Sequence, residues 1–158
     1  MELAKPWSDL NGYIEARRKE TLFEAELARE FLRQGLTRNA AGKAYQAWKA
    51  TIAVLAAKKL GYLSSVYRWV KRIKNKRVGM AEWLVAYMPS TRLREVARLL
   101  AEAYGIEVFL ATELALSLHE YQFNGPDKEL VLSRYKSDDE AARDVELLLK
   151  YVEVFLGA

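Results

Sequence analysis

Apolar residues recur at intervals of three and four along almost the whole chain, and this periodicity limits the fold more than any other sequence feature. It is the period of an amphipathic helix. Runs that alternate strictly between apolar and polar residues are absent, and only three prolines interrupt 158 residues. The sequence therefore predicts an all-α fold. A hydrophobic content of 51% fits one domain over residues 1–158.

Two long helices are predicted first. One covers about residues 13–34 and stops at Gly35, and the next covers about residues 37–60, with Thr37 as its cap and Gly61 at its end. Three apolar side chains lie one turn apart in the first helix: Phe23, Leu27 and Phe31. One stripe of the second helix is expected to face a partner helix: Ala41, Tyr45, Trp48, Ile52 and Leu55.

Alanines recur through the second helix, at positions 40, 41, 44, 47, 50, 53, 56 and 57. Their small side chains allow another backbone to come close, either within the bundle or across a dimer interface.

Helical patterns continue after the second helix. Residues 64–73 suggest a helix with four apolar positions that the following charges and Gly79 interrupt: Val66, Trp69, Val70 and Ile73. A short helix covers about residues 80–87. The next begins near Ser90, a candidate cap, and ends before Gly105. Its apolar face is formed by Leu93, Val96, Ala97, Leu100 and Ala103.

The most apolar helix is expected at residues 106–122, at the centre of the bundle. Its face combines Leu110, Leu114 and Leu118 with Val108, Ala111 and Ala115. Ser137 and Glu140 then form a capping box that opens the last helix. The inward positions of this helix are Ala141, Val145, Leu148, Val152 and Phe155.

Charge is distributed unevenly along the chain. Residues 1–80 hold 17 Lys/Arg and 7 Asp/Glu, for a net charge of +10, whereas residues 81–158 have a net charge of −6. Such a difference in net charge between the two halves of the chain favours antiparallel self-association or an anionic partner at the basic end.

The densest basic run is residues 67–77, YRWVKRIKNKR. Its candidate nucleic-acid contacts are Arg68, Lys71, Arg72, Lys74, Lys76 and Arg77. Basic side chains neutralise phosphates, and exposed Tyr or Trp rings can stack on bases. The alternative, which base rates favour, is that Trp69 and Ile73 face the core and the charges form a solvated face.

The stretch LHEYQFNGPD, residues 118–127, contains the only histidine. On a helix ending near Gln122, His119 lies at the edge of the apolar face, where a cationic imidazole suits the helix C-terminus. Pro126 can begin a short helix after the stop. Spacing favours His119 as an interhelical hydrogen-bonding residue over a catalytic one.

No metal or cofactor is predicted. One histidine and no cysteine leave only carboxylates as further ligands, and Glu113, Glu120 and Asp127 do not stand at the spacing of a closed metal site with His119. The lack of cysteine also fits a reducing cytoplasm, and the N-terminus, MELAKPWSDL, lacks the pattern of a secretion signal. Few Gln and Asn beside 29% charged residues indicate a thermostable protein.

Several segments together resemble the archaeal PaREP family, types one and eight. They are AYQAWKA at residues 44–50, PSTRL at 89–93, and LHEYQFNGPD at 118–127 followed by LSRY at 132–135. The resemblance covers about residue 35 to the C-terminus, and the LHEYQ-(aromatic)-NGPD pattern is its specific part. That family is similar to a branch of the HEPN superfamily, helical bundles that usually dimerise and often accompany small nucleotidyltransferases or RNA-targeting defence systems. The resemblance implies an antiparallel HEPN-type bundle of five or six helices, a homodimer, and a small nucleotidyltransferase-type protein as a candidate partner.

The resemblance does not imply catalytic activity. HEPN ribonucleases carry an arginine followed, after four to six residues, by a histidine, whereas here the positions five to seven before His119 are Leu114, Glu113 and Thr112. We therefore expect a non-catalytic binding module for nucleotide, RNA or a protein partner, with no membrane association. The ligand-binding candidates are Lys43, Trp48, Lys49, His119, Tyr121, Gln122, Asn124 and Arg134.

Two alternatives stay open. One is a toxin-like endoribonuclease in which His119 is the general base and Arg134, Lys43 or Lys49 supplies positive charge. The other is a purely structural dimer without a ligand.

Overall fold

The computed structural model describes residues 4–157 and is mostly helical. The described chain contains these elements, in order: α1 (Leu10–Arg33), α2 (Thr37–Lys58), α3 (Leu60–Val66), β1 (Val70–Ile73), β2 (Lys76–Gly79), α4 (Met80–Tyr87), α5 (Ser90–Tyr104), α6 (Glu107–Asn124) and α7 (Asp138–Leu156). These residues form seven helices rather than the five or six predicted, because residues 60–66 form a short helix of their own. None of these helices is long and apolar enough to cross a membrane.

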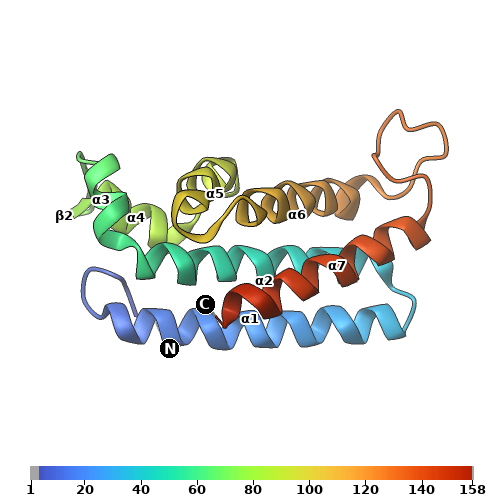
Figure 1. Cartoon of the computed structure of the whole chain (residues 1–158), viewed down its shortest axis with the longest axis horizontal. Helices are drawn as coiled ribbons and strands as arrows, with labels where there is room; N and C mark the ends of the chain where they lie inside the picture. The colour runs from blue at the N-terminus through green and yellow to red at the C-terminus, as the bar shows by residue number, and fades with distance from the viewer. Residues whose placement is uncertain (1–3, 158) are drawn as a thin grey trace.

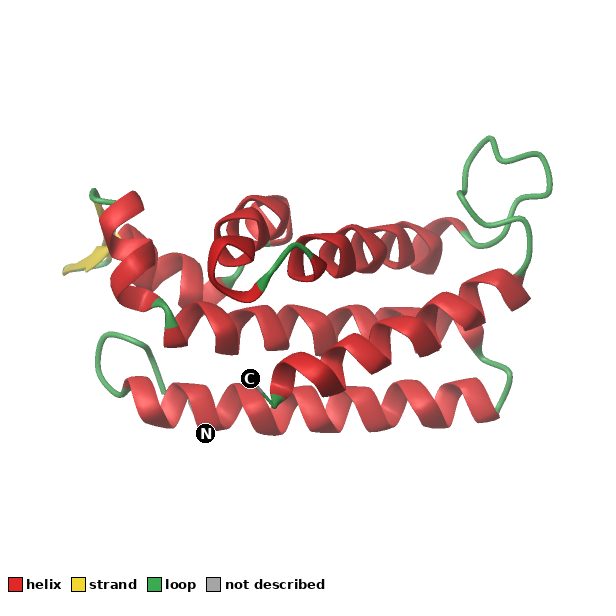
Figure 2. Ribbon diagram, viewed as in Figure 1, coloured by secondary structure: helices red, strands yellow, loops and turns green. Residues whose placement is uncertain are grey.

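The long helices lie in layers around α2 (Figures 1 and 2). α1 runs antiparallel beside α2, α7 crosses both, and α5 and α6 lie on the other side of α2 (Figure 1). The hairpin with α3 and α4 occupies one end of the long axis, and the loop between α6 and α7 projects at the other end (Figure 1). The side chains of a candidate site can therefore lie between the helix layers or at either end of the molecule.

α2 is the central helix, and its burial explains its alanine content. The predicted stripe of Ala41, Tyr45, Trp48, Ile52 and Leu55 is at most 1% exposed, which confirms that prediction. All eight alanines are buried as well, and α2 contacts α1, α4, α5, α6 and α7. The prediction that residues 106–122 form the centre was wrong, because α6 leaves Leu110 53% exposed.

Two other predicted apolar faces differ from the structure. Phe23 is 63% exposed, because the buried face of α1 contains Tyr13, Ala25 and Ala28 instead. Ala103 is also exposed, near the end of α5. The five inward positions predicted for α7 are all buried.

Helix ends follow the predicted signals at some places and not at others. Gly35 has φ +74° and follows α1, and the Ser137 hydroxyl accepts from the Glu140 N–H at 3.3 Å, which confirms Ser137 as the N-cap of α7. The Glu140 carboxylate accepts from the Lys136 N–H at 3.1 Å instead of the Ser137 N–H, so the second half of the predicted capping box is shifted by one residue. Thr37 and Ser90 are first helical residues rather than caps, and neither helix has a side-chain cap. α2 ends at Lys58, three residues before Gly61, which lies in the first turn of α3.

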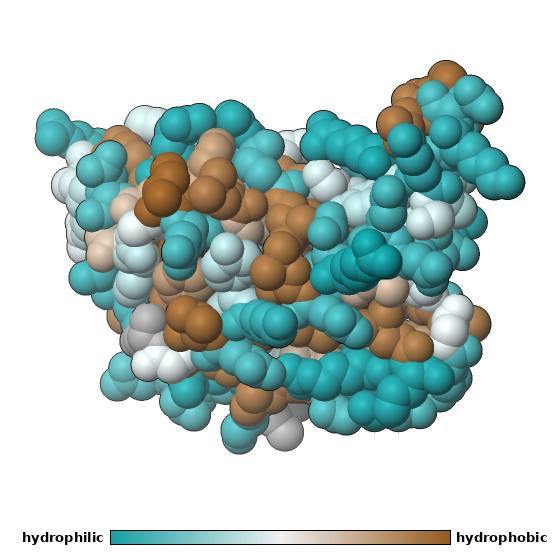
Figure 3. Space-filling model, turned by 45° about the vertical axis from the view of Figure 1, so that its right-hand side comes forward, coloured by the Kyte–Doolittle hydropathy of each residue, from teal (hydrophilic) through white to brown (hydrophobic). Residues whose placement is uncertain are grey.

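The loop over residues 125–137 replaces the short helix predicted at Pro126. The Asp127 carboxylate accepts hydrogen bonds from the backbone N–H groups of Glu129, Val131 and Leu132, which draws the chain into a closed turn. Leu130, at φ +55°, lies in the middle of that turn. Figure 3 shows apolar atoms at the tip of this projecting segment, where Val131 is 78% exposed.

Candidate functional site

His119 lies near the end of α6 against α2. Its ring stacks on Tyr45, with centroids 4.1 Å apart and an interplanar angle of 21°. The edge of the Phe123 ring packs against it at 5.2 Å. The Nδ1 atom is buried and has no hydrogen-bond partner among the described residues. The predicted role of His119 as a satisfied interhelical hydrogen-bonding residue is therefore wrong for Nδ1, since the contact between the helices is made by the ring face.

The surroundings of His119 favour its neutral form. Burial lowers the pKa of the imidazole, and the positive charge of Lys49 lowers it further, while a hydrogen bond with Gln122 and the charge of Glu120 oppose these effects. The cationic histidine expected at the helix end is therefore disfavoured.

Lys49 shares this environment. Burial lowers the pKa of its amine, and the nearby Arg17 guanidinium lowers it further, against the opposing effect of Glu20. Lys49, Arg17, Glu20 and Gln46 line a small cavity of about 70 Å³ beside α2. Three predicted residues, Lys49, His119 and Gln122, thus belong to one half-buried cluster.

Gln122 can reach His119 because α2 has a glycine opposite it. A Cβ atom at Gly42 would lie 2.5 Å from the Gln122 Nε2 atom, so any side chain there would displace the amide. Arg38 holds the same end of α6: its Nε donates to the Gln122 carbonyl at 3.0 Å and its Nη2 to the Phe123 carbonyl at 2.6 Å. These bonds satisfy two carbonyls that the helix end would leave unpaired.

Two other predicted residues belong to the core. Trp48 is fully buried, and its Nε1 donates to the Thr112 hydroxyl at 2.9 Å. Tyr121 is 1% exposed, and its hydroxyl donates to the Asp138 carboxylate. Both side chains join α6 to a neighbouring helix, which leaves their polar atoms engaged within the protein.

The last three predicted residues have partners on the surface. Lys43 Nζ lies 3.1 Å from the Glu24 carboxylate. Asn124 Nδ2 donates to the Leu132 carbonyl at 2.9 Å, and Arg134 Nη1 donates to the Ser117 hydroxyl at 2.9 Å. Asn124 and Arg134 tie the projecting loop to α6, so the structure does not bring these three residues into the cluster around His119.

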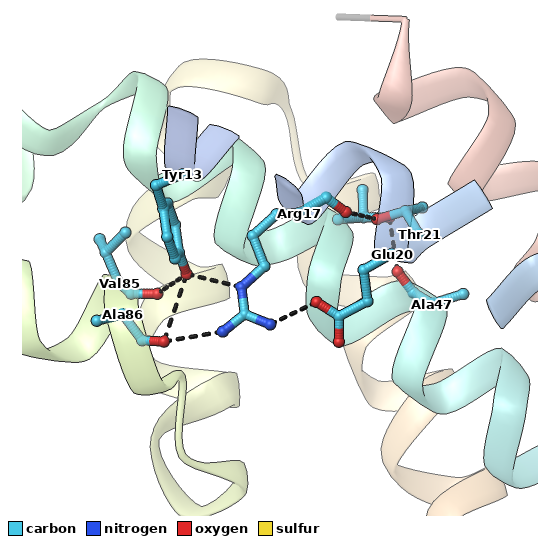
Figure 4. A network of polar contacts seen from close by, with 8 residues as sticks. Tyr13, Arg17, Glu20, Thr21, Ala47, Val85 and Ala86 are labelled. Carbon is cyan, nitrogen blue, oxygen red and sulfur yellow. Dashed lines mark hydrogen bonds and ion pairs between the residues drawn. The ribbon is translucent and has the colours of Figure 1, made fainter. Parts of the chain in front are cut away.

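A polar network on α1 was missed by the sequence analysis. The Tyr13 hydroxyl donates to the Val85 carbonyl, and Arg17 donates to the Tyr13 hydroxyl at 3.0 Å and to the Ala86 carbonyl at 2.9 Å (Figure 4). Arg17 also pairs with Glu20 at 2.5 Å. The network satisfies carbonyls in the last turn of α4. Its signal in the sequence is the spacing of Tyr13, Arg17 and Glu20 by four and three, which places them on one helix face.

The basic run forms a β-hairpin, and the helix predicted at residues 64–73 stops at Val66. β1 and β2 pair antiparallel through the two-residue turn Lys74-Asn75, with Lys74 at φ +53°. A two-residue turn of this kind closes a hairpin directly, and the positive φ falls on Lys74, at the first central position, where glycine is usually preferred. The helical spacing of Trp69 and Ile73 was misleading because the same residues also fit extended strands.

The hairpin exposes its charges and its aromatic residue. All six predicted nucleic-acid candidates are exposed, and none forms an ion pair within residues 4–157. Arg72 lies directly opposite Arg77 in the ladder, where like charges are destabilising. Trp69 is 54% exposed, so the alternative that placed it in the core was wrong, and Ile73 is half-buried.

A model of the archaeal PaREP1/PaREP8 family matches residues 16–146 of this chain. The chain belongs to that family. No curated protein matches it, and no solved structure does.

In this PaREP1/PaREP8 chain, the segment that carried the resemblance serves mainly to hold elements together. His119 stacks on α2, Tyr121 bonds to Asp138 at the start of α7, and Asn124 and Asp127 shape the projecting loop. Residues 4–157 contain no group of three His, Cys, Asp or Glu side chains that could hold a metal ion. Within residues 4–157, the cations of the hairpin form no ion pair.

Proposed function

We propose that this chain is a non-catalytic helical binding module of HEPN type that binds the phosphodiester backbone of nucleic acid through its β-hairpin. The observation that carries the proposal is the uncompensated charge of the hairpin, where Arg72 opposes Arg77 and no carboxylate among residues 4–157 neutralises either. Phosphates would relieve this repulsion, and their counterions would be released on binding.

The burial and the contacts of His119 support the non-catalytic part of the proposal. A general base must come within hydrogen-bond reach of the proton that it removes. The Nδ1 atom of His119 is buried, and one ring face is covered by Tyr45. Gln122 interacts with the same imidazole.

A homodimer is part of the proposal, as the resemblance to HEPN proteins implies. It is supported by large apolar side chains that stay exposed on α1 and α7: Leu22, Phe23 and Val154. Burying such side chains is the main favourable contribution to association.

The test is charge reversal in the hairpin, with Lys71→Glu, Arg72→Glu and Lys74→Glu combined. The wild-type protein should bind fluorescein-labelled RNA at low salt, with an affinity that falls as salt rises. Each lost phosphate contact reduces the magnitude of the negative slope of log K against log salt by about 0.7–0.9. The loss of three contacts in the variant should therefore reduce that magnitude by about 2. Fluorescence anisotropy over a salt series measures both quantities.

A matched control reverses the same number of charges elsewhere. Lys19, Arg143 and Lys150 are exposed residues of α1 and α7, and their replacement by Glu changes the net charge equally. Unchanged affinity in the hairpin variant, or an equal loss in the control, would overturn the proposal.

A ribonuclease is the second candidate, favoured by the position of Lys49 close enough to lower the pKa of His119. A neutral imidazole beside a cation is a combination used in acid–base chemistry. We expect purified protein to leave total RNA intact on a denaturing gel. RNA cleavage that His119→Ala or Lys49→Ala abolishes would establish this second candidate instead.

A further inference from the structure

A groove of about 640 Å³ lies beside the hairpin. One wall comes from the end of α3 and the segment that follows it and includes Val66 and Trp69, and the other comes from α5 and includes Arg94 and Arg98. The volume lies within the range of about 300–1,000 Å³ that is usual for ligand sites.

Trp69 is held in place although its ring is exposed. Its carbonyl accepts the Met80 N–H at 2.9 Å, which fixes the backbone where the hairpin meets α4. The Tyr67 ring packs against it at 5.6 Å with an interplanar angle of 81°. An edge-to-face contact covers at most one face of the indole, and Trp69 is 54% exposed, so the indole is oriented and still available for stacking.

The groove is positively charged. Its carboxylate, Glu95, accepts the Tyr67 hydroxyl and lies 3.1 Å from Arg92. Arg94 pairs with Glu113 at 2.6 Å. Arg98 lies over the Phe109 ring, 4.4 Å from its centroid, and has no carboxylate partner within residues 4–157. The groove thus presents an unneutralised guanidinium together with an exposed indole.

We infer that this groove is a binding site for an unpaired base of a single-stranded nucleic acid, which stacks on Trp69 while Arg98 and the hairpin cations contact the adjoining phosphates. The inference rests on the proposed function and adds to it the class of ligand. A positively charged groove with aromatic stacking platforms is the general design of single-strand binding sites.

A double helix would use this surface poorly. Its bases are stacked on each other, so a base face reaches Trp69 only after the duplex is unstacked. The phosphates of a duplex would still contact the hairpin cations. We therefore expect two separate contributions to binding affinity. The hairpin charges contribute to the binding of single strands and duplexes, whereas Trp69 contributes to the binding of single strands.

The experiment compares Trp69→Ala with the wild-type protein. The probes are a short fluorescein-labelled oligouridine and a blunt RNA duplex of the same length, both at low salt. We expect Trp69→Ala to weaken oligouridine binding about tenfold or more, the usual effect of losing one stacked base, and to leave duplex binding unchanged. Trp69→Phe should restore part of the affinity, and Arg98→Gln should weaken oligouridine binding.

Leu110→Ala serves as the control, because Leu110 is 53% exposed on α6 and lies outside the groove. The inference would be overturned if Trp69→Ala left oligouridine affinity unchanged, or if it weakened the binding of both probes equally. Charge reversal in the hairpin would still test the proposed function in either case. If neither probe binds the wild-type protein at low salt, the inference and the proposed function both fail.

Discussion

At the scale of single residues, the neighbours of His119 determine the protonation of its imidazole in the half-buried cluster. The histidine stacks on Tyr45, and the amide of Gln122 reaches it because Gly42 leaves room. Burial and the charge of Lys49 both act against the imidazolium form. The cluster therefore keeps an aromatic, uncharged imidazole between two helices.

The first prediction at this scale concerns the titration of His119. Because the chain has one histidine, its imidazole gives a single NMR titration curve, and we expect a pKa below the ordinary value of 6.5. The folded pKa is depressed, so the stability contributed by the neutral ring is complete above pH 6.5. It is lost as pH falls through the folded pKa.

Lys49→Met removes the nearby positive charge and should raise the pKa of His119 toward its ordinary value. Lys43→Met is the control on the same helix, because Lys43 pairs with Glu24. A pKa at or above 6.5 in the wild-type protein, or equal shifts in both variants, would contradict this account.

At the scale of elements, α2 organises the fold through close contacts on several sides. Its alanines permit the approach of α1, and its large residues fill the space toward α6 and α7. Trp48 joins α2 to α6 by the bond to Thr112 and packs edge-on against Phe155 of α7, with ring centroids 5.9 Å apart. One side chain thus connects three helices.

We expect Trp48→Ala to lower the free energy of unfolding by about 3–5 kcal/mol, because it opens a cavity among three helices. Trp48→Phe should cost less, since most of the ring volume stays. Val131→Ala should change stability by less than about 0.5 kcal/mol, because that side chain is 78% exposed. Urea unfolding followed by circular dichroism measures all three, and similar losses for Trp48→Ala and Val131→Ala would contradict the assignment of the core.

For the whole molecule, two exposed features lie at opposite ends of the long axis. The basic hairpin lies at one end, and the loop with exposed Val131 and Leu132 lies at the other (Figure 1). Residues 1–80 carry the excess positive charge in the sequence, and the fold exposes five of these cations on one hairpin. The proposed nucleic-acid binding at that end would leave the opposite end and the exposed apolar side chains of α1 and α7 available for protein contacts.

The sequence by itself determined the helical class, the stripe of α2, the inward face of α7 and the N-cap at Ser137, because helical periodicity and capping are local properties. It also placed Lys49, His119 and Gln122 among the candidate residues, and the archaeal family resemblance agrees with the family match.

Only the tertiary structure decided the rest. Residues 70–79 fit a helix or a hairpin by spacing, and the Lys74-Asn75 turn with its strand pairing became evident in three dimensions. Phe23 and Leu110 are apolar at helical spacing but exposed, because the neighbours of a helix decide which of its apolar faces is covered. The exposure of Trp69 and the contacts of Arg17 with the end of α4 likewise join segments far apart in the chain, which no local pattern encodes.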